Sequence, residues 1–275
     1  MAAFGRLIMS DNYRTTVGKV QLVSLTDGHF EPVPTDVFQD SDIETWQSEY
    51  SALMIDKGHT QFRFGSVAIY SSRKIIVVDT GAGPNGCLID DMGRKGVERD
   101  DVDFVLITHL HADHTGWTLL EGEPTFPNAR YLVPKDDYAY WTQPNVISNA
   151  PNIENDVAPL KSLGVMDLIE PNYIITPELT TVHTPGHTPG HTSLAISSNG
   201  ENGFVLGDVA HSPAQAHYTD WNPNFDVDQE LSRETRNQVL DELEEQGILV
   251  QAGHFPEPGF GHFSRKNNRR YWLGV

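Results

Sequence analysis

A dense run of metal-competent side chains lies near the middle of the chain. Residues 109 to 114 read His109-Leu110-His111-Ala112-Asp113-His114 and follow an apolar run at 104–107. The apolar run predicts a buried strand, and side chains at the end of a strand are held firmly enough to set metal geometry. A polar loop that is merely rich in histidine is the alternative, but this combination directly after a strand is uncommon. The pattern predicts a site for two metal ions.

The same arrangement, an apolar strand followed by a metal-competent residue, recurs elsewhere in the chain. An apolar run at 75–78 ends at Asp79, which enters a glycine turn. Residues 182–191 contain two consecutive Pro-Gly turns that fix the backbone around their histidines. The remaining members of the pattern are His183, His187 and His191 in that segment, Asp208 after 204–207, and His254 after 248–250.

Imidazole and carboxylate ligands indicate what the site could do. They suit zinc and also manganese, iron or cobalt, so ligand type alone does not choose the metal. Two ions about 3.5 to 4 Å apart can share a hydroxide and polarise a substrate oxygen, which is hydrolytic chemistry. Asp113 could act as a general base, but its position between other ligands favours a ligand role. We expect His183 to be a buried histidine that is satisfied by hydrogen bonds.

Taken together, these motifs resemble the metallo-β-lactamase superfamily from about Val17 to the C-terminus. The resemblance implies that Asp208 bridges two ions. It also implies that Asp79 supports the site without binding metal, and that His191 is a structural hydrogen-bonding residue. By the same resemblance, the first ion is bound by His109, His111 and His187, and the second by Asp113, His114 and His254.

The resemblance also implies a fold, an α/β four-layer αββα sandwich with two mixed sheets between helices. We expect residues 1–275 to form a single domain, with 28–58 as a lid or dimer arm because this stretch shows no sustained periodicity. Helices are predicted near 87–96, 135–142, 154–163 and 229–246. Strands are predicted near 18–25, 62–71, 74–79, 103–108, 129–133, 179–183, 192–197, 203–207 and 248–251.

Composition excludes several classes of partner. The net charge is −19, from 38 acidic and 19 basic residues, and the one dense basic stretch is 265–270, so we expect no nucleic-acid partner. We interpret that stretch as a solvated terminal strand or an interface edge. No apolar run approaches the roughly 18 residues that span a bilayer. Residues 1–9 lack the pattern of a secretory signal, and Cys87 is the single cysteine, so a cytoplasmic location is expected.

Local sequence narrows the resemblance to one branch. The segments 207–211 and 254–262 resemble the methyl parathion hydrolase-like branch, which includes lactone and aryl-ester hydrolases. Related N-acyl-homoserine lactonases carry a tyrosine three positions after the bridging aspartate, where this chain has His211. His211 is therefore a candidate proton donor or substrate contact, with capping of local backbone as the alternative. The aromatic residues of 217–225 either wall an apolar pocket or pack under the 229–246 helix.

The sequence thus predicts a dinuclear metal-dependent hydrolase of a lactone or activated carboxylic ester, with two divalent ions, most simply Zn²⁺. A metal-bridging hydroxide would attack the carbonyl, and phosphotriesters would be side substrates. We expect a small-molecule substrate, no membrane partner and a homodimer. The alternatives are a dedicated organophosphate hydrolase or hydrolytic dehalogenase and, from another class, a non-hydrolytic iron-dependent redox protein.

Overall fold

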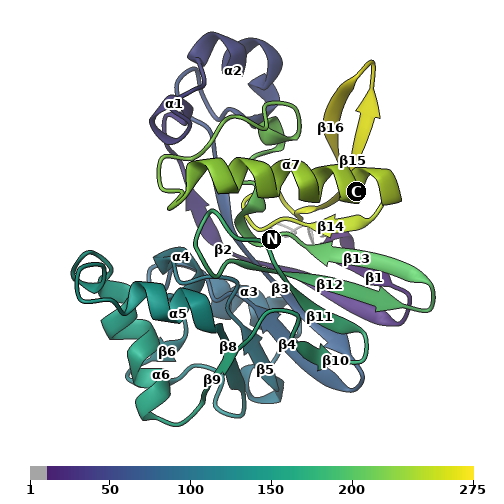
Figure 1. Ribbon diagram of the computed structural model, residues 1–275. Coiled ribbons are helices and arrows are strands. Elements are labelled where there is room, and N and C mark those ends of the chain that lie inside the picture. Colours follow the sequence, from purple (N-terminus) through teal and green to yellow (C-terminus); the bar gives the residue numbers. More distant parts are fainter. Residues whose placement is uncertain (1–10) are drawn as a thin grey trace, which may run out of the picture.

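Two seven-stranded sheets form the centre of the molecule (Figure 1). The computed structural model describes residues 11–275, so the expectation about a signal at 1–9 lies outside the described residues. The strand order is β1-β2-β3-β4-β5-β8-β9 in the first sheet and β10-β11-β12-β13-β14-β15-β16 in the second. Among the described residues, no helix is long and apolar enough to cross a membrane.

The first sheet is antiparallel at one side and parallel at the other. β1 to β4 pair antiparallel, and β4, β5, β8 and β9 pair parallel. Its strands are β1 (Arg14–Val17), β2 (Val20–Phe30), β3 (Phe62–Ser71), β4 (Lys74–Val78), β5 (Phe104–Leu106), β8 (Arg130–Pro134) and β9 (Met166–Ile169).

The second sheet is antiparallel except where β13 and β14 pair parallel. Its strands are β10 (Ile174–Thr176), β11 (Leu179–His183), β12 (Thr192–Ser198), β13 (Glu201–Val205), β14 (Leu249–Gln251), β15 (Phe260–Lys266) and β16 (Arg269–Gly274). A separate small ladder pairs β6 (Leu119–Leu120) with β7 (Glu123–Pro124).

The helices flank the two sheets. They are α1 (Pro34–Val37), α2 (Ile43–Glu49), α3 (Leu88–Arg94), α4 (Ala112–Thr115), α5 (Lys135–Trp141), α6 (Ala158–Ser162) and α7 (Gln229–Gln246). Short 3₁₀ turns occupy Asp11–Tyr13, Ser51–Leu53, Arg99–Asp101, Ile147–Asn149, Gly207–Val209 and Pro213–Ala216, and a π-helical turn occupies Ile153–Val157.

Three apolar cores separate four layers. One core packs residues of the first sheet, such as Val105, against α3 and α6, and a second fills the space between the sheets around Ile76 and Leu194. The third packs Leu240 and Leu243 of α7 on the second sheet. The expected αββα sandwich is therefore confirmed.

Several predicted boundaries were wrong for identifiable reasons. The strand expected at 18–25 is interrupted at its start, because Gly18 adopts a φ of 56° in the turn between β1 and β2. The helix expected at 154–163 is α-helical only from Ala158, since a π-helical turn precedes it. The basic stretch 265–270, by contrast, is part of a terminal strand pair as one interpretation had it: it spans the ends of β15 and β16 and the turn between them, in which Asn267 and Asn268 take positive φ, as a tight hairpin turn requires.

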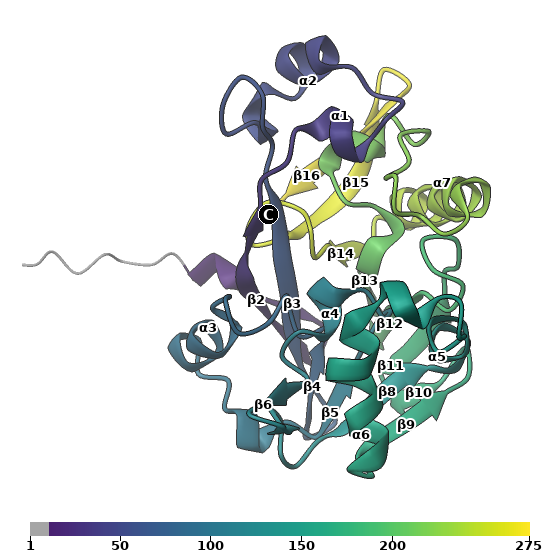
Figure 2. The same cartoon turned by 90° about the vertical axis from the view of Figure 1, so that its left-hand side faces the viewer.

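The segment 28–58 contains two short helices instead of a featureless loop. α1 and α2 lie at the same end of the molecule as the β15–β16 hairpin in both views (Figures 1 and 2). Phe38 and Trp46 are fully buried there and pack with Phe62 and Trp221. Trp46 and Trp221 stack with ring centroids 5.4 Å apart. The segment therefore covers one end of its own chain, and its role as a lid or dimer arm stays a prediction.

Candidate metal centre

The predicted ligands come together because of how the strands pair. β4 and β5 are parallel neighbours, and so are β13 and β14, so the carboxyl end of each pair opens at one edge of its sheet. Asp79 follows β4, the 109–114 run follows β5, Asp208 follows β13 and His254 follows β14. His187 comes from the turn between β11 and β12. The structure brings all seven predicted ligands together.

Three histidines form the first cluster. The Nε2 atoms of His109 and His187 are 3.2 Å apart, and they lie 3.1 and 2.9 Å from Nδ1 of His111. His109 and His187 are almost fully buried. Three imidazole nitrogens that converge at one point are the arrangement that a tetrahedral zinc ion needs from its protein ligands.

The second cluster is built from Asp113, His114 and His254. Oδ2 of Asp113 lies 3.6 Å from Nε2 of each histidine. Asp208 stands between the two clusters. Its Oδ2 is 3.1 Å from His254 Nε2, 3.3 Å from His114 Nε2, 3.5 Å from His187 Nε2 and 3.6 Å from His109 Nε2. This position fits a carboxylate shared by two ions.

Hydrogen bonds made on the far side of each ring set which nitrogen faces inward. Nδ1 of His114 lies 2.9 Å from Asp79 Oδ2, and Nδ1 of His254 lies 2.8 Å from the carbonyl oxygen of Arg63. Nδ1 of His187 lies 2.7 Å from Asp226 Oδ1. Because each Nδ1–H donates to one of these acceptors, the proton is held on Nδ1 and the lone pair of Nε2 is directed into the centre.

Two buried polar atoms indicate whether a cation fits between the clusters. His114 Nε2 and Asp208 Oδ1 are buried and have no hydrogen-bond partner among the described residues. Buried polar atoms of this kind are costly unless something binds them. A divalent cation between the clusters would accept electron pairs from both atoms, so the donor set fits such ions.

The electrostatics also suit metal ions. Burial lowers the pKa of His109 and His187 well below 6.5 and that of His111 to about 4, so these imidazoles are neutral near pH 7. Burial acts to raise the pKa of Asp208, but His254, His114 and the other nearby histidines together hold it well below 3.8. The neutral imidazoles of the first cluster and the ionised Asp208 are the ligand forms that divalent metals require. In the second cluster burial acts to lower the pKa of His114 and His254, but Asp208 raises both, so a metal ion would displace a proton there.

The residues expected to support the site do so by hydrogen bonding. Asp79 accepts from the backbone N–H and the hydroxyl of Thr108 at 2.7 and 2.8 Å, in addition to its contact with His114. His191 uses both nitrogens elsewhere, since Nε2 accepts from the backbone N–H of Asp208 and Nδ1 lies 3.0 Å from the carbonyl of Thr184. Half-buried His183 contacts the carbonyl of Pro189 at 2.9 Å.

Sequence reasoning missed four buried residues that hold the ligand loops. Asp137 accepts from the backbone N–H groups of Leu110 and Gly190, and so joins two of these loops. Asp27 accepts from the indole N–H of Trp117 and from backbone N–H groups in 82–88. The other two are Arg63 and Asp226. Each lies far in sequence from its partner, so no local spacing could reveal it.

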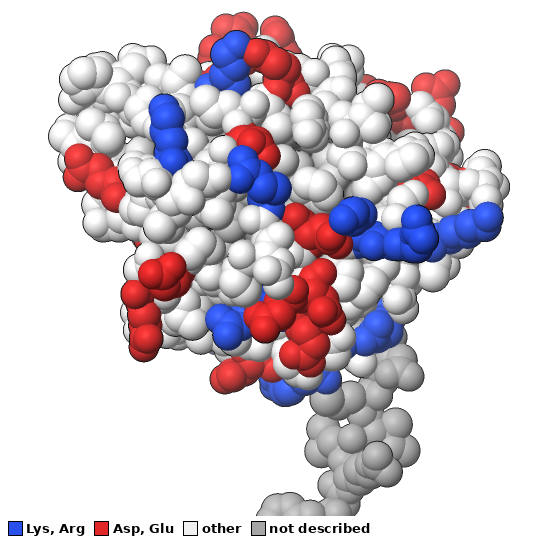
Figure 3. Space-filling view, turned by 90° about the horizontal axis from the view of Figure 1, so that it is seen from below, with Lys and Arg blue, Asp and Glu red and all other residues white. Residues whose placement is uncertain are grey.

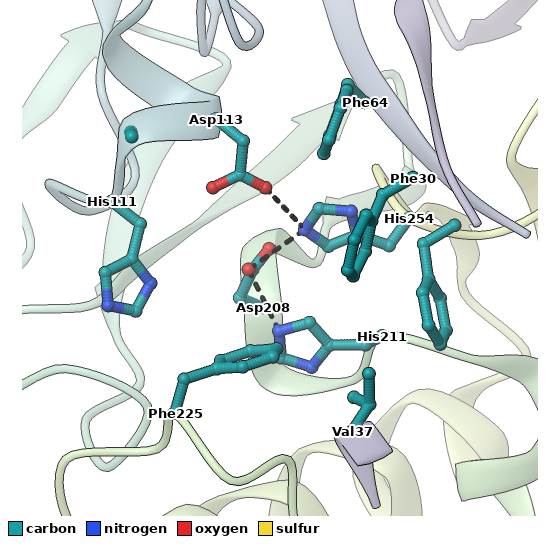
Figure 4. Close-up of a pocket in the computed structure, with 11 residues that line it drawn as sticks. Phe30, Val37, Phe64, His111, Asp113, Asp208, His211, Phe225 and His254 are labelled. Carbon is teal, nitrogen blue, oxygen red and sulfur yellow. Dashed lines mark hydrogen bonds and ion pairs between the residues drawn. The ribbon is translucent and has the colours of Figure 1, made fainter. Parts of the chain in front are cut away.

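An apolar pocket opens above the clusters (Figure 4). Its volume is about 230 Å³, and Asp113, Asp208, His211 and His254 converge at its floor. Its other lining residues are Phe30, Val37, Phe62, Phe64, His111, Ala112 and Phe225. The aromatic residues of 217–225 lie in two different environments. Phe225 lines the pocket, whereas Tyr218 and Trp221 stack on each other and pack against the α2 region instead of under α7.

His211 lies within this pocket floor. Its ring stacks on that of His254, with centroids 5.1 Å apart and an angle of 12° between the planes. Nε2 lies 3.1 Å from Asp208 Oδ2, yet neither ring nitrogen has a hydrogen-bond partner among the described residues. The side chain therefore caps no backbone group. Together with His187 and Asp208, it is also close enough to share a cation.

The four-layer sandwich and the histidine and aspartate clusters at its strand ends define a class of metal-binding αββα proteins. The family model described as the metallo-beta-lactamase superfamily matches residues 62–254, and the chain belongs to that superfamily.

Comparison with individual proteins agrees with this membership. The chain is 25% identical over 167 residues to N-acyl homoserine lactonase AiiA of Bacillus thuringiensis subsp. kurstaki, a match that covers 61% of each protein. It is 34% identical over 115 residues to AttM of Rhizobium radiobacter, covering 40% of this chain and 41% of that one. The chain thus spans about three fifths of the length of the curated relatives it matches first.

Two solved structures share the whole fold. The hydrolase AbOPH of the beta lactamase superfamily superimposes with a TM-score of 0.87 at 25% identity, covering 97% of this chain and 98% of that one. AidC, described as a dizinc quorum-quenching lactonase, gives a TM-score of 0.84 at 20% identity, with 97% and 99% covered. The second likeness is one of fold alone.

Proposed function

We propose that this protein is a metal-dependent hydrolase of neutral, apolar lactones or activated carboxylic esters. The observation that carries the proposal is the pair of ligand clusters around Asp208 at the floor of an apolar pocket. Similarity to N-acyl homoserine lactonases supports a lactone as the substrate. Two bound divalent ions would lower the pKa of water and polarise the carbonyl oxygen of the substrate.

The pocket wall supports the choice of substrate. Phe30, Phe64 and Phe225 surround the space above the clusters in Figure 4. None of the described residues that line it is a lysine or arginine. An apolar wall contributes free energy by removing substrate surface from water, and it gives no partner to a charged group. The wall therefore favours substrates that are neutral and apolar away from the reacting carbonyl.

In this proposal His211 supplies a proton to the leaving oxygen. Hydrolysis adds water across the carbonyl carbon and the ester oxygen, so the C–O bond breaks and the departing alkoxide needs a proton. Nε2 of His211 is buried at the pocket floor and has no hydrogen-bond partner among the described residues. Positioned there, it can donate to that oxygen, and proton transfer of this kind typically contributes about 10²- to 10⁴-fold in rate.

A neutral phosphotriester is the second candidate substrate, because it satisfies the same apolar wall without a cationic partner. The two are separated by initial rates on one lactone, one aryl ester and one phosphotriester. Each is measured with purified protein before and after chelation and after zinc is restored. We expect chelator-sensitive turnover that is fastest on the lactone. A rate on the phosphotriester that exceeds both others would reverse the order, and no turnover on the three would overturn the proposal.

A further inference from the structure

Two arginines are buried inside the protein close to the candidate metal centre. Arg63 is 1% exposed and Arg236 is 0% exposed. Burial lowers the pKa of each guanidinium to about 10, so both remain charged at neutral pH. A buried charge is costly unless hydrogen bonds satisfy it fully. The partners of these two side chains therefore indicate why they are present.

Arg63 contacts His254, the last of the predicted metal ligands along the chain, and the two residues before it. Its Nε and Nη2 donate to the carbonyls of Gly253 and Ala252, each at 3.1 Å, and Nη1 donates to Ser24 Oγ at 2.7 Å. Its own carbonyl accepts from His254 Nδ1 at 2.8 Å, and its N–H donates to the His254 carbonyl. Residues 252–254 are thus held by both the backbone and the side chain of Arg63.

Arg236 of α7 acts on the opposite cluster through Asp226. Nη2 lies 3.5 Å from Asp226 Oδ2, and the other carboxylate oxygen accepts from His187 Nδ1 at 2.7 Å. Nε donates to the carbonyl of Val209, the residue after Asp208, at 2.8 Å. Nη1 donates to the Thr219 carbonyl and to Asn222 Oδ1. The guanidinium therefore ties the loop that carries Asp226 to the turn that carries Asp208.

The backbone of the Asp226 loop makes the same connection. The N–H of Val227 donates to the His187 carbonyl at 2.9 Å, and the N–H of Asp228 donates to the Gly186 carbonyl at 3.0 Å. Asp228 also caps α7 by accepting from Leu231 N–H, so the start of the helix is fixed to the His187 turn. These contacts hold the backbone of the His187 turn, whereas the contact with Asp226 holds the His187 ring. Loss of the Asp226 carboxylate would therefore leave the ring free to rotate or change tautomer.

We infer that Arg63 and Arg236 are positioning residues, each of which holds the ligands of one half of the dinuclear centre. Arg236, through Asp226, orients His187 in the first cluster, and Arg63 orients His254 in the second. The planar guanidinium fork can bridge several fixed acceptors at once, which a lysine ammonium cannot do in the same geometry. This inference rests on the proposed metal centre, but it concerns the affinity for metal and is independent of the substrate.

The test is zinc affinity, measured by competition with a chromophoric chelator, in wild type, Asp226→Asn, Arg236→Lys and Arg63→Lys. Removing a residue that hydrogen-bonds to a metal ligand typically weakens metal binding by about 10- to 100-fold. We expect one of two zinc sites to weaken by that factor in each variant. Asp226→Asn keeps the shape of the side chain and leaves the buried cation in place, so it tests the first link even if a lysine variant folds poorly.

Cobalt substitution identifies the weakened site. The first cluster presents three imidazoles, whereas the second presents two and a carboxylate. Paramagnetically shifted imidazole N–H resonances should therefore be lost from the first cluster in Asp226→Asn and Arg236→Lys, and from the second in Arg63→Lys. Arg270→Lys is the matched control. Arg270 is 5% exposed and pairs with Glu244 and Asp241, away from the ligands.

Three outcomes decide the inference. The inference is supported if Asp226→Asn and Arg236→Lys weaken the first site, Arg63→Lys weakens the second, and Arg270→Lys leaves both intact. Wild-type affinity at both sites in Asp226→Asn, Arg236→Lys and Arg63→Lys would overturn it, as would equal weakening of both sites in every variant. If wild type binds two zinc ions but hydrolyses no ester, the proposed function fails while this inference can still hold.

Discussion

At the scale of single residues, Asp208 is the residue on which both halves of the centre depend. Its Oδ2 lies within 3.6 Å of histidine nitrogens from both clusters, and it is 2% exposed. Replacing the carboxylate by an amide keeps its size but removes the negative charge that two cations would share. The effect should therefore reach both sites, unlike that of a residue that belongs to one cluster.

We predict that Asp208→Asn loses both ions and that His109→Ala loses the ion of the first cluster. Mutating a residue that hydrogen-bonds to a metal ligand typically lowers activity by up to roughly 100-fold, and we expect these two variants to lose more than that. Elemental analysis and initial rates on the same preparations measure this. Full activity in either variant, with the metal content of wild type, would contradict the assigned roles.

A second prediction concerns His211. His211→Gln should slow hydrolysis of an alkyl lactone by about 100-fold or more, since its alkoxide needs a proton. An aryl ester with a good leaving group should be much less affected, because a phenolate departs unaided. Metal content should stay at the wild-type level. Equal losses on both substrates, or loss of an ion, would show that His211 instead holds metal or structure.

At the scale of helices and strands, sequence periodicity located most of the scaffold. The boundaries expected for β3, β11 and α7 agree with the structure, because long alternating or amphipathic runs carry a strong local signal. β1, β9 and β10 were missed, since each has three or four residues and lies at a sheet edge, and the β15–β16 hairpin was anticipated only as a possible terminal strand over 265–270. Local pattern does not show which strand a segment of three or four residues will join.

The residues of the metal centre likewise divide into those that the sequence predicts and those that only the fold reveals. The histidines and aspartates of the metal centre were predicted because each lies directly after an apolar run or in a Pro-Gly turn. Asp226 is separated from His187 by 39 residues, and Arg63 from His254 by 191. Contacts of this kind arise from tertiary packing, so only the assembled fold reveals them.

The pocket wall gives a prediction at this scale, because α1, β2 and β3 contribute to it together. Phe30, at the end of β2, is 48% exposed although it lines the pocket. Phe30→Ala should raise KM for a long-chain acyl lactone by up to about 10-fold. That factor corresponds to the free energy gained when an apolar side chain is partly buried against the substrate. KM for an unsubstituted small lactone should change little. Ile174→Ala, at a 68% exposed position away from the pocket, is the control.

The π-helical turn before α6 gives a prediction about stability and pH. Burial raises the pKa of Asp156, a half-buried residue, to about 6 from its ordinary 3.8. The folded protein thus holds this proton more tightly than the unfolded chain, so stability falls as pH rises from about 4 to 6. Asp156→Asn should increase the free energy of unfolding by about 1 kcal/mol at pH 7.5, after allowance for solvent screening.

Urea denaturation at pH 7.5 and pH 4 measures this difference. We expect the gain at the higher pH and almost none at the lower, where the carboxyl is protonated in both states. Asp136→Asn, at an exposed position on α5, controls for removal of one negative charge. A gain that is the same at both pH values would show that burial of the Asp156 charge is not its cause.

At the scale of the whole molecule, two layers of sheet and two of helix bring distant ligands to one edge, and α1 and α2 cover the end beside it (Figures 1 and 2). In Figure 3, one face carries several groups of acidic side chains and a row of basic side chains along its right-hand side. A homodimer through 28–58 stays a prediction, which native mass measurement can test.

The measurement that tests the central claim most directly is the metal content of the purified protein, coupled to lactone hydrolysis before and after chelation. We predict about two zinc equivalents per chain, a colourless protein, and turnover that is lost with the metal and returns with zinc. A single iron with a visible chromophore, or lactone hydrolysis that survives complete removal of metal, would contradict the account.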